Sequence, residues 1–413
     1  MTAELNANTH SSPPLIGLAA LMRMVFEEKD LKPLAAELTA RAERDPLDAN
    51  ALLDLSTILQ LNFQHQLAMH LQDEAINTQR VYSLPSRQQP AKLRLLALLG
   101  AGDLLSNTPV ECLLENSDID LDILYVSPTL PIPQTVPDHD VLFVAIGECA
   151  ENLPILQDLN KLGEFWPRPV INSPEHIARL SRDNTCALLG DISGVLMPIS
   201  KRLNKQHVNN IPEQQQILEH VLPGTTYPII IRPLDSHAGR GLAKIEQSQA
   251  LENYLQTMPE NEFYVSPFVD YRSADGLFRK YRIILIDGVP YICHLAISSH
   301  WMIHYLNAGM ADSAEKRAEE AQCFAQFDTR FAARHAQAFA QIAQRLKLDY
   351  LGIDCAETSD GKLLIFEVDS NMIVHDFDPA DKYPYKKPQM QKIFSAFREL
   401  LKKKAHRDPS ERA

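Results

Sequence analysis

One stretch near the end of the chain, residues 351–376, constrains the fold most strongly. Two short apolar runs, 352–357 and 363–368, flank the dipeptide Asp360-Gly361. An Asp-Gly pair between such runs is the strongest short-range signal for a β-hairpin. The sequence therefore predicts two antiparallel strands joined by a tight turn.

The register of this hairpin brings three carboxylates together. With a two-residue turn Ser359 faces Lys362, Asp354 lies opposite Glu367, and Asp369 lies on the same face. Like charges opposite each other destabilise a sheet, so this patch needs a cation or a shared proton. Mg²⁺ binds one or two protein carboxylates together with substrate phosphates, which indicates a nucleotide and metal site. The alternative is a solvated sheet face with scattered acids.

Composition narrows the class of protein. The 413 residues allow two or three domains, and a net charge of −13 makes nucleic acid an improbable partner. The six cysteines form no CxxC pair, which favours buried thiols in a reducing compartment. The apolar N-terminal run is too short and too charged for a signal peptide or membrane span. We expect a cytoplasmic protein without a membrane partner.

The first part of the chain is expected to be helical. Residues 1–13 are polar and are expected to be disordered, whereas apolar residues recur at helical spacing through 14–84. Asp48 is a candidate N-cap, and residues 46–60 with the following helix are similar to one tetratricopeptide unit. One repeat cannot bury its own apolar face. Region 14–84 therefore packs on the main body, or binds a protein partner or a second copy of the chain.

An α/β domain is expected over 85–200. Short apolar runs predict buried parallel strands at 93–99, 121–126, 141–146 and 170–171. The loop 100–103 lacks the third glycine of a dinucleotide fingerprint. A helix is expected from Pro174 to Asp183.

A glycine-containing loop follows the next strand. Strand 227–233 carries Arg232 near its end, and residues 236–241 include Gly239 and Gly241, which let backbone N–H groups turn toward an anion. The loop therefore suits a flexible phosphate cover. The alternative is an ordinary hairpin turn with a return strand at 242–245.

Two further strands complete the pattern. Pro267 predicts an edge or interrupted position for strand 263–269. Strand 278–286 has Lys280 and Arg282 on the same face, which suggests an anion there rather than a solvated face. Asp287-Gly288 predicts a hairpin turn at its end.

The remaining segments carry weaker signals. His300 and His304 have the spacing of a helical zinc pair, but no third ligand is evident, so core or substrate-pocket roles are favoured. Helices are expected at 311–326 and 329–346. Residues 401–413 are expected to be a solvated tail.

The order of these elements resembles the ATP-grasp superfamily of carboxylate ligases, in particular RimK-type glutamate ligases and prokaryotic glutathione synthetases. The resemblance covers roughly residues 90–400. It implies an α/β (α+β) architecture, with a pre-ATP-grasp subdomain at 85–200 and an ATP-grasp domain at 201–400, and it implies ATP with Mg²⁺ or Mn²⁺ as cofactors.

The resemblance also assigns roles to residues, position by position. Arg232 and Arg282 match basic residues beside the reacting phosphate. Residues matching nucleotide-binding positions are Arg182, Arg232, Ser236, His237, Gly239, Gly241, Val265, Phe268, Asp270 and Lys280. Residues matching metal-binding positions are Asp354, Glu367, Asp369 and Asn371. The chain departs from the family pattern at Asp369, where Asn is usual, and at Ser266-Pro267, where many relatives have Gln-Glu.

The activity implied is an ATP-dependent ligation that forms a peptide-like C–N bond through an acyl phosphate, on small-molecule or peptide carboxylate and amine substrates. Two alternatives stay open. One is a nucleotide-binding scaffold without catalysis, and the other is a small-molecule kinase on the same fold.

Overall fold

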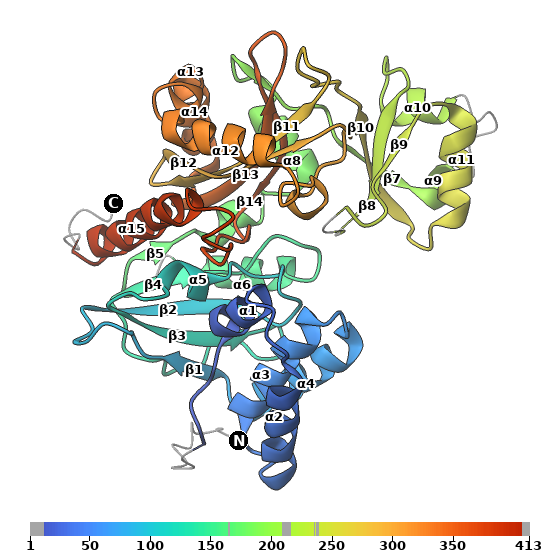
Figure 1. Cartoon of the computed structure of the whole chain (residues 1–413). Coiled ribbons are helices and arrows are strands. Elements are labelled where there is room, and N and C mark those ends of the chain that lie inside the picture. Colours follow the sequence, from blue (N-terminus) through green and yellow to red (C-terminus); the bar gives the residue numbers. More distant parts are fainter. Residues whose placement is uncertain (1–11, 164–165, 209–215, 235, 237–238, 407–413) are drawn as a thin grey trace.

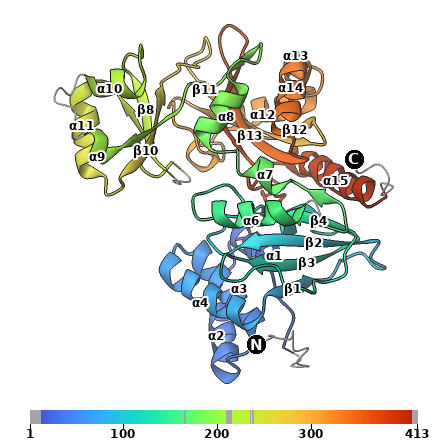
Figure 2. The same cartoon turned by 180° about the vertical axis from the view of Figure 1, so that it is seen from behind.

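The computed structural model describes residues 12–163, 166–208, 216–234, 236 and 239–406. Within these residues the strands form three sheets, with helices packed around them (Figure 1 and, from behind, Figure 2). The mixed α/β fold class that the sequence predicts is confirmed.

The N-terminal part of the described chain is helical, as predicted. Its helices are α1 (Leu18–Phe26), α2 (Lys32–Arg44), α3 (Ala49–Leu61) and α4 (His65–Thr78). Asp48 caps α3, because its carboxylate accepts a hydrogen bond from the Ala51 N–H at 3.0 Å. Helices α3 and α4 pack against each other. The similarity of this pair to a tetratricopeptide unit stays a prediction.

The first sheet has the strand order β1-β3-β2-β4-β5. The strands are β1 (Val81–Leu84), β2 (Leu93–Gly100), β3 (Ile119–Val126), β4 (Val141–Val144) and β5 (Val170–Ile171). Strands β2 to β5 pair in parallel, and β1 is antiparallel to β3. The predicted run of buried parallel strands is confirmed. The helices that follow are α5 (Val110–Leu114), α6 (Leu153–Gly163), α7 (Pro174–Ile177) and α8 (Arg182–Leu189).

The single helix expected from Pro174 to Asp183 is wrong. Helix α7 ends at Ile177, and Ser181 has an extended backbone (φ −55°, ψ 148°) that separates it from α8. This break makes Arg182 the first residue of α8, from where its side chain reaches the third sheet.

The second sheet has the order β7-β10-β8-β9. Its strands are β7 (Lys201–Asn204), β8 (Ile229–Pro233), β9 (Ala243–Ile245) and β10 (Glu262–Pro267), and its helices are α9 (Lys205–Val208), α10 (Gln216–Val221) and α11 (Ser248–Thr257). The return strand expected at 242–245 is confirmed as β9. Strand β10 lies between β7 and β8, so of the edge or interrupted position that Pro267 predicts, the interrupted one is confirmed. Pro267 is tolerated because β7 pairs only as far as Val265, so Pro267 has a strand partner, Ile229, on one side alone.

The third sheet has the order β12-β11-β13-β14-β6. Its strands are β6 (Val195–Leu196), β11 (Phe278–Ile286), β12 (Val289–Ser298), β13 (Tyr350–Glu357) and β14 (Leu363–Asp369). Asp287 and Gly288 both have positive φ (52° and 78°) and connect β11 to β12, which confirms the predicted turn.

Helices on this sheet close the core. They are the 3₁₀ helix η1 (Tyr305–Asn307), α12 (Ala314–Gln326), α13 (Phe331–Arg334), α14 (Ala336–Leu346) and α15 (Lys386–Ala405). The helix expected at 329–346 is interrupted at His335 (φ −101°, ψ 14°). Helix α15 continues to Ala405, inside the segment expected to be a tail, and Leu401 on it is fully buried.

Helix α15 joins the first and third sheets into one core. Its Phe397 ring lies 5.6 Å from the Phe143 ring of β4 and 5.5 Å from the Tyr350 ring of β13. Figure 1 shows the helix between the two sheets. The two sheets are therefore fixed relative to each other by shared aromatic packing.

The N-terminal helices are held against the rest of the chain by charge and ring contacts. The Arg23 guanidinium pairs with Glu115 and, at 2.8 Å, with Asp376. The Phe26 ring lies 4.5 Å from the His375 ring. Among the described residues no helix has the length and apolar character needed to cross a membrane.

Candidate active site

A cavity of about 840 Å³ lies at the junction of the second sheet, the third sheet and the loop after β2. Residues of the second sheet and of the helices α3 and α4 line this cavity. Its volume is in the range of small-molecule and cofactor sites. The cavity contains most of the side chains that the sequence marks as functional.

The hairpin β13–β14 brings Asp354 and Glu367 opposite each other and Gly352 opposite Asp369, as predicted. The predicted two-residue turn is wrong, because Thr358 pairs with Lys362 around three turn residues, with Gly361 at φ 80°. A β-bulge offsets the extra residue: Cys355 pairs with Ile365, and Phe366 has no partner in the β13 ladder.

Asp354 is held by two cations of the neighbouring strand β11. The Arg282 guanidinium binds it with both ends of its fork, Nε at 2.8 Å and Nη2 at 3.0 Å, and the Lys280 ammonium lies 2.7 Å from Oδ2. Burial alone would raise the pKa of Asp354, but the charges of Arg282 and Lys280 hold that pKa well below its usual range. Asp354 is therefore a buried, permanently charged carboxylate.

Glu367 is held by Arg182 at the start of α8. The guanidinium pairs with the Glu367 carboxylate and donates a second hydrogen bond, at 2.8 Å, to the carbonyl of Phe366. Burial opposes the charged form of Glu367, but the charges of Arg182 and Arg232 lower its pKa. The bulge at Phe366 thus gives Arg182 a carbonyl to bind beside the carboxylate.

Arg232 on β8 contributes a fourth cation. Its Nε lies 3.2 Å from the Oγ of Ser236, which itself donates to the Pro233 carbonyl at 2.8 Å. Burial, together with the nearby charge of Arg182, lowers the pKa of Arg232 to about 10. Arg232 lines the cavity, whereas Ser236 is buried behind it and positions the guanidinium.

Gly239 closes the described part of the glycine loop onto the cavity. It has φ 73°, and a side chain there would meet His304 Nε2 at 2.3 Å. Gly241, also at positive φ, packs against Pro233. Glycine is required at both positions by backbone conformation and by space. The predicted contact His237 lies outside the described residues.

Asp369 and Asn371 differ from the other two acids. Burial and the charge of Glu367 raise the pKa of Asp369 to about 7. Asn371 donates its amide to the Leu105 carbonyl, while its buried Oδ1 has no hydrogen-bond partner. Asp369 is therefore close enough to Glu367 to feel its charge, and among the described residues neither Asp369 nor Asn371 Oδ1 forms an ion pair or hydrogen bond with a cationic side chain.

These oxygens allow a test of whether the residues fit a divalent cation. Within the part of the chain described, no group of three or more His, Cys, Asp and Glu side chains is arranged to hold a metal ion. Asp354 is occupied by Arg282 and Lys280. The oxygens of Asp369 and Asn371, next to Glu367, match the hard-oxygen preference of Mg²⁺. Asp354 is bound by two cations and Glu367 by one, Arg182, so the contacts favour Glu367, with Asp369 and Asn371, over Asp354 as metal ligands.

The opposite end of the cavity is aromatic. The Phe268 ring stacks edge-on with the Trp301 ring at 5.9 Å, and the Lys244 ammonium lies 4.1 Å from the Phe268 centroid. The predicted nucleotide contact Phe268 lines the cavity, but Val265 is buried in the core of the second sheet. Asp270 is paired with Arg272 at the surface and does not line the cavity.

The two histidines singled out by spacing behave differently. His304 lines the cavity and precedes η1, so the pair does not lie on a helix. His300 is exposed and does not line the cavity. The arrangement supports the pocket role predicted for His304 and gives no support to a zinc pair.

Sequence reasoning missed the contribution of the N-terminal helices. Met22 of α1 and the turn between α3 and α4, with Leu61, Phe63 and His65, line the same cavity as Arg282. The signal available was a phenylalanine within the polar stretch Asn62-Phe63-Gln64-His65, where a helix connection needs no aromatic ring.

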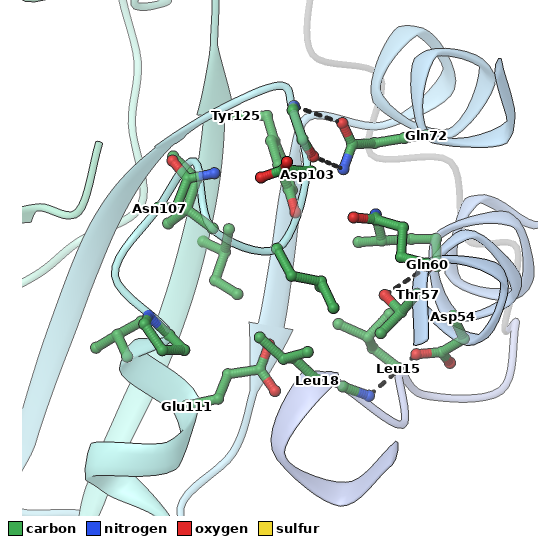
Figure 3. A pocket seen from close by; sticks show the side chains of 18 of the residues that line it. Leu15, Leu18, Asp54, Thr57, Gln60, Gln72, Asp103, Asn107, Glu111 and Tyr125 are labelled. Carbon is green, nitrogen blue, oxygen red and sulfur yellow. Dashed lines mark hydrogen bonds between the residues drawn. The ribbon is translucent and has the colours of Figure 1, made fainter. Parts of the chain in front are cut away.

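A second, smaller cavity of about 50 Å³ lies between the N-terminal helices and the first sheet (Figure 3). There the Gln72 amide of α4 binds both backbone groups of Gly102, accepting from N–H at 2.8 Å and donating to C=O at 3.0 Å. Asp54 accepts the N–H groups of Ile16 and Gly17. The volume suits water rather than a substrate, and its polar side chains fix the loop after β2.

Comparison with known proteins gives structural neighbours only. No family model and no curated protein matches the chain. Three similar solved structures are the D-alanine–D-alanine ligase of Bacillus anthracis complexed with ATP, the VanG D-Ala:D-Ser ligase of Enterococcus faecalis and a RimK domain protein ATP-grasp of Sphaerobacter thermophilus.

Their sequence identities to this chain are 14%, 14% and 15%, with TM-scores of 0.45, 0.47 and 0.42. They cover 75%, 76% and 73% of this chain and 99%, 100% and 98% of their own. Two are ligases by name and one is an ATP-grasp protein.

Proposed function

We propose that this chain is an ATP-dependent ligase that joins a carboxylic acid to an amine through an acyl phosphate. One observation carries the proposal: Arg182, Arg232, Lys280 and Arg282 line one cavity around two facing carboxylates, Asp354 and Glu367. These carboxylates hold three of the four cations in place, and guanidinium and ammonium groups are strong partners for phosphate oxygens.

The nucleotide would lie along the cavity from its aromatic end. Phe268 and Trp301 offer ring surfaces for adenine, and the backbone of β10 runs beside them. The triphosphate then extends toward Arg232 and Arg182. Gly239 and Gly241, at positive φ, let the loop approach the phosphates closely.

The reaction requires no nucleophile from the protein. A carboxylate oxygen of the substrate attacks the γ-phosphorus, and the bond to the bridging oxygen breaks with its electrons leaving on ADP. The amine nitrogen then attacks the acyl carbon, phosphate leaves, and the nitrogen releases a proton. Positively charged groups already fixed around the phosphoryl group stabilise the charge that develops.

The residues divide this work by position. Arg232 and Arg182 bind phosphate oxygens, and Arg282 with Lys280 orients the transferred group and the carboxylate beside it. Asp354 holds the guanidinium and ammonium groups of Arg282 and Lys280 in place. Mg²⁺, which Glu367, Asp369 and Asn371 would hold, supplies further neutralisation of phosphate charge.

The direct test traps the acyl phosphate. Purified protein is incubated with ATP, Mg²⁺, hydroxylamine and a panel of carboxylic acids, and ADP, phosphate and hydroxamate are measured. We expect the three products in equal amounts, and a loss of at least about 100-fold in Glu367→Gln. Glu357→Gln, on the same hairpin but paired with Arg334 outside the cavity, is the matched control.

The products also separate the alternatives. AMP and diphosphate in place of ADP would contradict the proposal. A phosphorylated acid that hydroxylamine does not convert would indicate a kinase, and ATP binding without turnover across the panel would indicate a scaffold.

A further inference from the structure

The turn between α3 and α4 contains a residue that neither burial nor backbone conformation explains. The Phe63 side chain is 85% exposed, and its φ is 60°, in the left-handed region that a bulky residue avoids. A glycine would suit the position better. Strained, exposed aromatic residues that line a cavity are candidates for ligand contact.

Phe63 belongs to an apolar wall formed by six residues from four segments of the chain. They are Met22, Leu61, Phe63, Leu105, Met372 and Ile373. The last two follow Asn371 directly in sequence. The wall therefore adjoins Asn371, whose amide also binds the Leu105 carbonyl of the wall.

The wall is fixed by hydrogen bonds. Gln72 binds both backbone groups of Gly102, which holds the loop after β2 to α4. Three residues on, the Leu105 carbonyl accepts the Asn371 amide. Hydrogen bonds thus connect helix α4, the loop after β2 and the segment that follows β14. The N-terminal helices therefore form part of the cavity wall.

We propose that this wall selects the acid substrate by binding the apolar body of an aliphatic or aromatic monocarboxylic acid whose carboxylate reaches Arg282 and Lys280. The inference rests on the proposed ligase function. A second charge on the substrate would lose its hydration against the wall, and Asp103, which also lines the cavity, would repel a second carboxylate. The wall therefore excludes dicarboxylic acids.

The test compares 4-phenylbutyrate with glutarate in the hydroxamate assay. Wild-type protein is expected to use 4-phenylbutyrate with a kcat/KM at least about tenfold higher. Phe63→Gly is expected to raise the KM for 4-phenylbutyrate about tenfold, while kcat and the KM for ATP stay unchanged. Leu67→Ser, on a half-exposed site of α4 outside the cavity, is the matched control and should change neither constant.

The outcomes distinguish this inference from the proposed function. Equal kcat/KM for both acids, or unchanged kinetic constants in Phe63→Gly, would contradict substrate selection by the wall. Neither result would contradict the proposed ligase function. If no acid gave hydroxamate, the ligase would be overturned, and calorimetry of 4-phenylbutyrate with a non-hydrolysable ATP analogue would test the wall alone. If 4-phenylbutyrate binds to wild type but not to Phe63→Gly, substrate selection by the wall is supported. If 4-phenylbutyrate does not bind to wild type, this inference is contradicted. A dimer that dissociates in Phe63→Gly would also overturn it.

Discussion

The guanidinium of Arg282 donates two hydrogen bonds to the Asp354 carboxylate, from Nε at 2.8 Å and from Nη2 at 3.0 Å. The Lys280 ammonium lies 2.7 Å from the same carboxylate. The sequence predicts an anion beside Lys280 and Arg282, because both cations lie on one face of their strand. In the structure this anion is the Asp354 carboxylate on the neighbouring strand β13. The cations are thereby fixed before any phosphate arrives, which lowers the cost of organising the site.

The fork geometry gives a prediction for Arg282→Lys. A lysine keeps the charge but has no second N–H to match the carboxylate, so it loses one charge-assisted hydrogen bond. We expect kcat to fall about 10- to 100-fold, corresponding to roughly 1.5–3 kcal/mol. Steady-state ADP release measures the effect.

Arg279→Lys is the control for this substitution. Arg279 is also on β11 and forms a two-carboxylate pairing with Asp275 and Glu319, but it lies outside the cavity. Equal losses of kcat in the two variants would show that strand stability, not the position of Arg282, limits turnover.

Most residues that the sequence marks as functional line the cavity, but their contacts with one another were not predicted. The sequence placed Asp354 opposite Glu367 through the hairpin register, and the structure has the same pairing. Its pairing with Arg282 was not predictable, because it depends on β11 lying beside β13, a neighbour relation that no local pattern encodes.

At the scale of the element, the hairpin β13–β14 differs from the predicted hairpin at two points, and their effects on the strand register cancel. The turn has three residues where two are predicted, and the unpaired Phe366 shifts the register back before Glu367. The bulge also exposes the Phe366 carbonyl that Arg182 binds. A bulge of this kind has no clear sequence signal, since Phe366 continues an apolar strand pattern.

Two single deletions in this hairpin test the role of the bulge. Deleting Ser359 leaves the Asp360-Gly361 pair as a two-residue turn, so we expect ligase activity to stay unchanged and stability to change by less than about 1 kcal/mol. Deleting Phe366 makes the ladder regular and removes the carbonyl bound by Arg182. We expect activity to fall at least about tenfold.

Circular dichroism and urea unfolding accompany the activity measurements. Both variants should retain the fold, although the Phe366 deletion also removes packing against the Tyr271 ring at 5.0 Å. Full activity without Phe366 would contradict the view that the bulge positions Arg182.

At the scale of the whole molecule, buried acids join the N-terminal helices to the first sheet. Glu111 on α5 accepts the Ala19 N–H of α1 at 3.1 Å, and its Oε2 fills space that a side chain at position 17 would need. Burial raises the pKa of Glu111 from about 4.5 to about 7. The charged carboxylate is thus costly at neutral pH.

This cost predicts a pH dependence of stability. When the pKa of a carboxyl group is higher in the folded state than in the unfolded state, the group contributes its full stabilisation of the folded state at pH values below its pKa in the unfolded state. This contribution is lost as the pH rises through its pKa in the folded state. Between pH 4.5 and 7 we expect the free energy of unfolding of the wild-type protein to fall, relative to that of Glu111→Gln, by on the order of 1–3 kcal/mol.

Urea unfolding of both proteins at pH 5 and 7.5 measures this difference. Glu37→Gln, at an exposed site on α2, retains Glu111 and serves as the control, so its stability should change with pH in parallel with that of wild type. Parallel stability curves for wild type and Glu111→Gln would contradict the prediction.

Most strands were predictable, because alternation, apolar runs and turn residues are local signals, but β1, β6 and β7 were not expected and the grouping of strands into three sheets was not predicted. The role of the N-terminal helices was not. Their place at the cavity depends on contacts with Gly102, Glu115 and Asp376, which are remote in sequence and have no periodic pattern.

The ion pair between Arg23 and Asp376 joins residues 353 positions apart. During synthesis on the ribosome, helix α1 emerges early, but this partner appears only when nearly the whole chain has been made. A nascent chain therefore contains helix α1 before this ion pair can form. Any chain that stops before Asp376 lacks one of the two carboxylates that bind Arg23, so the contacts of α1 are completed only late in translation.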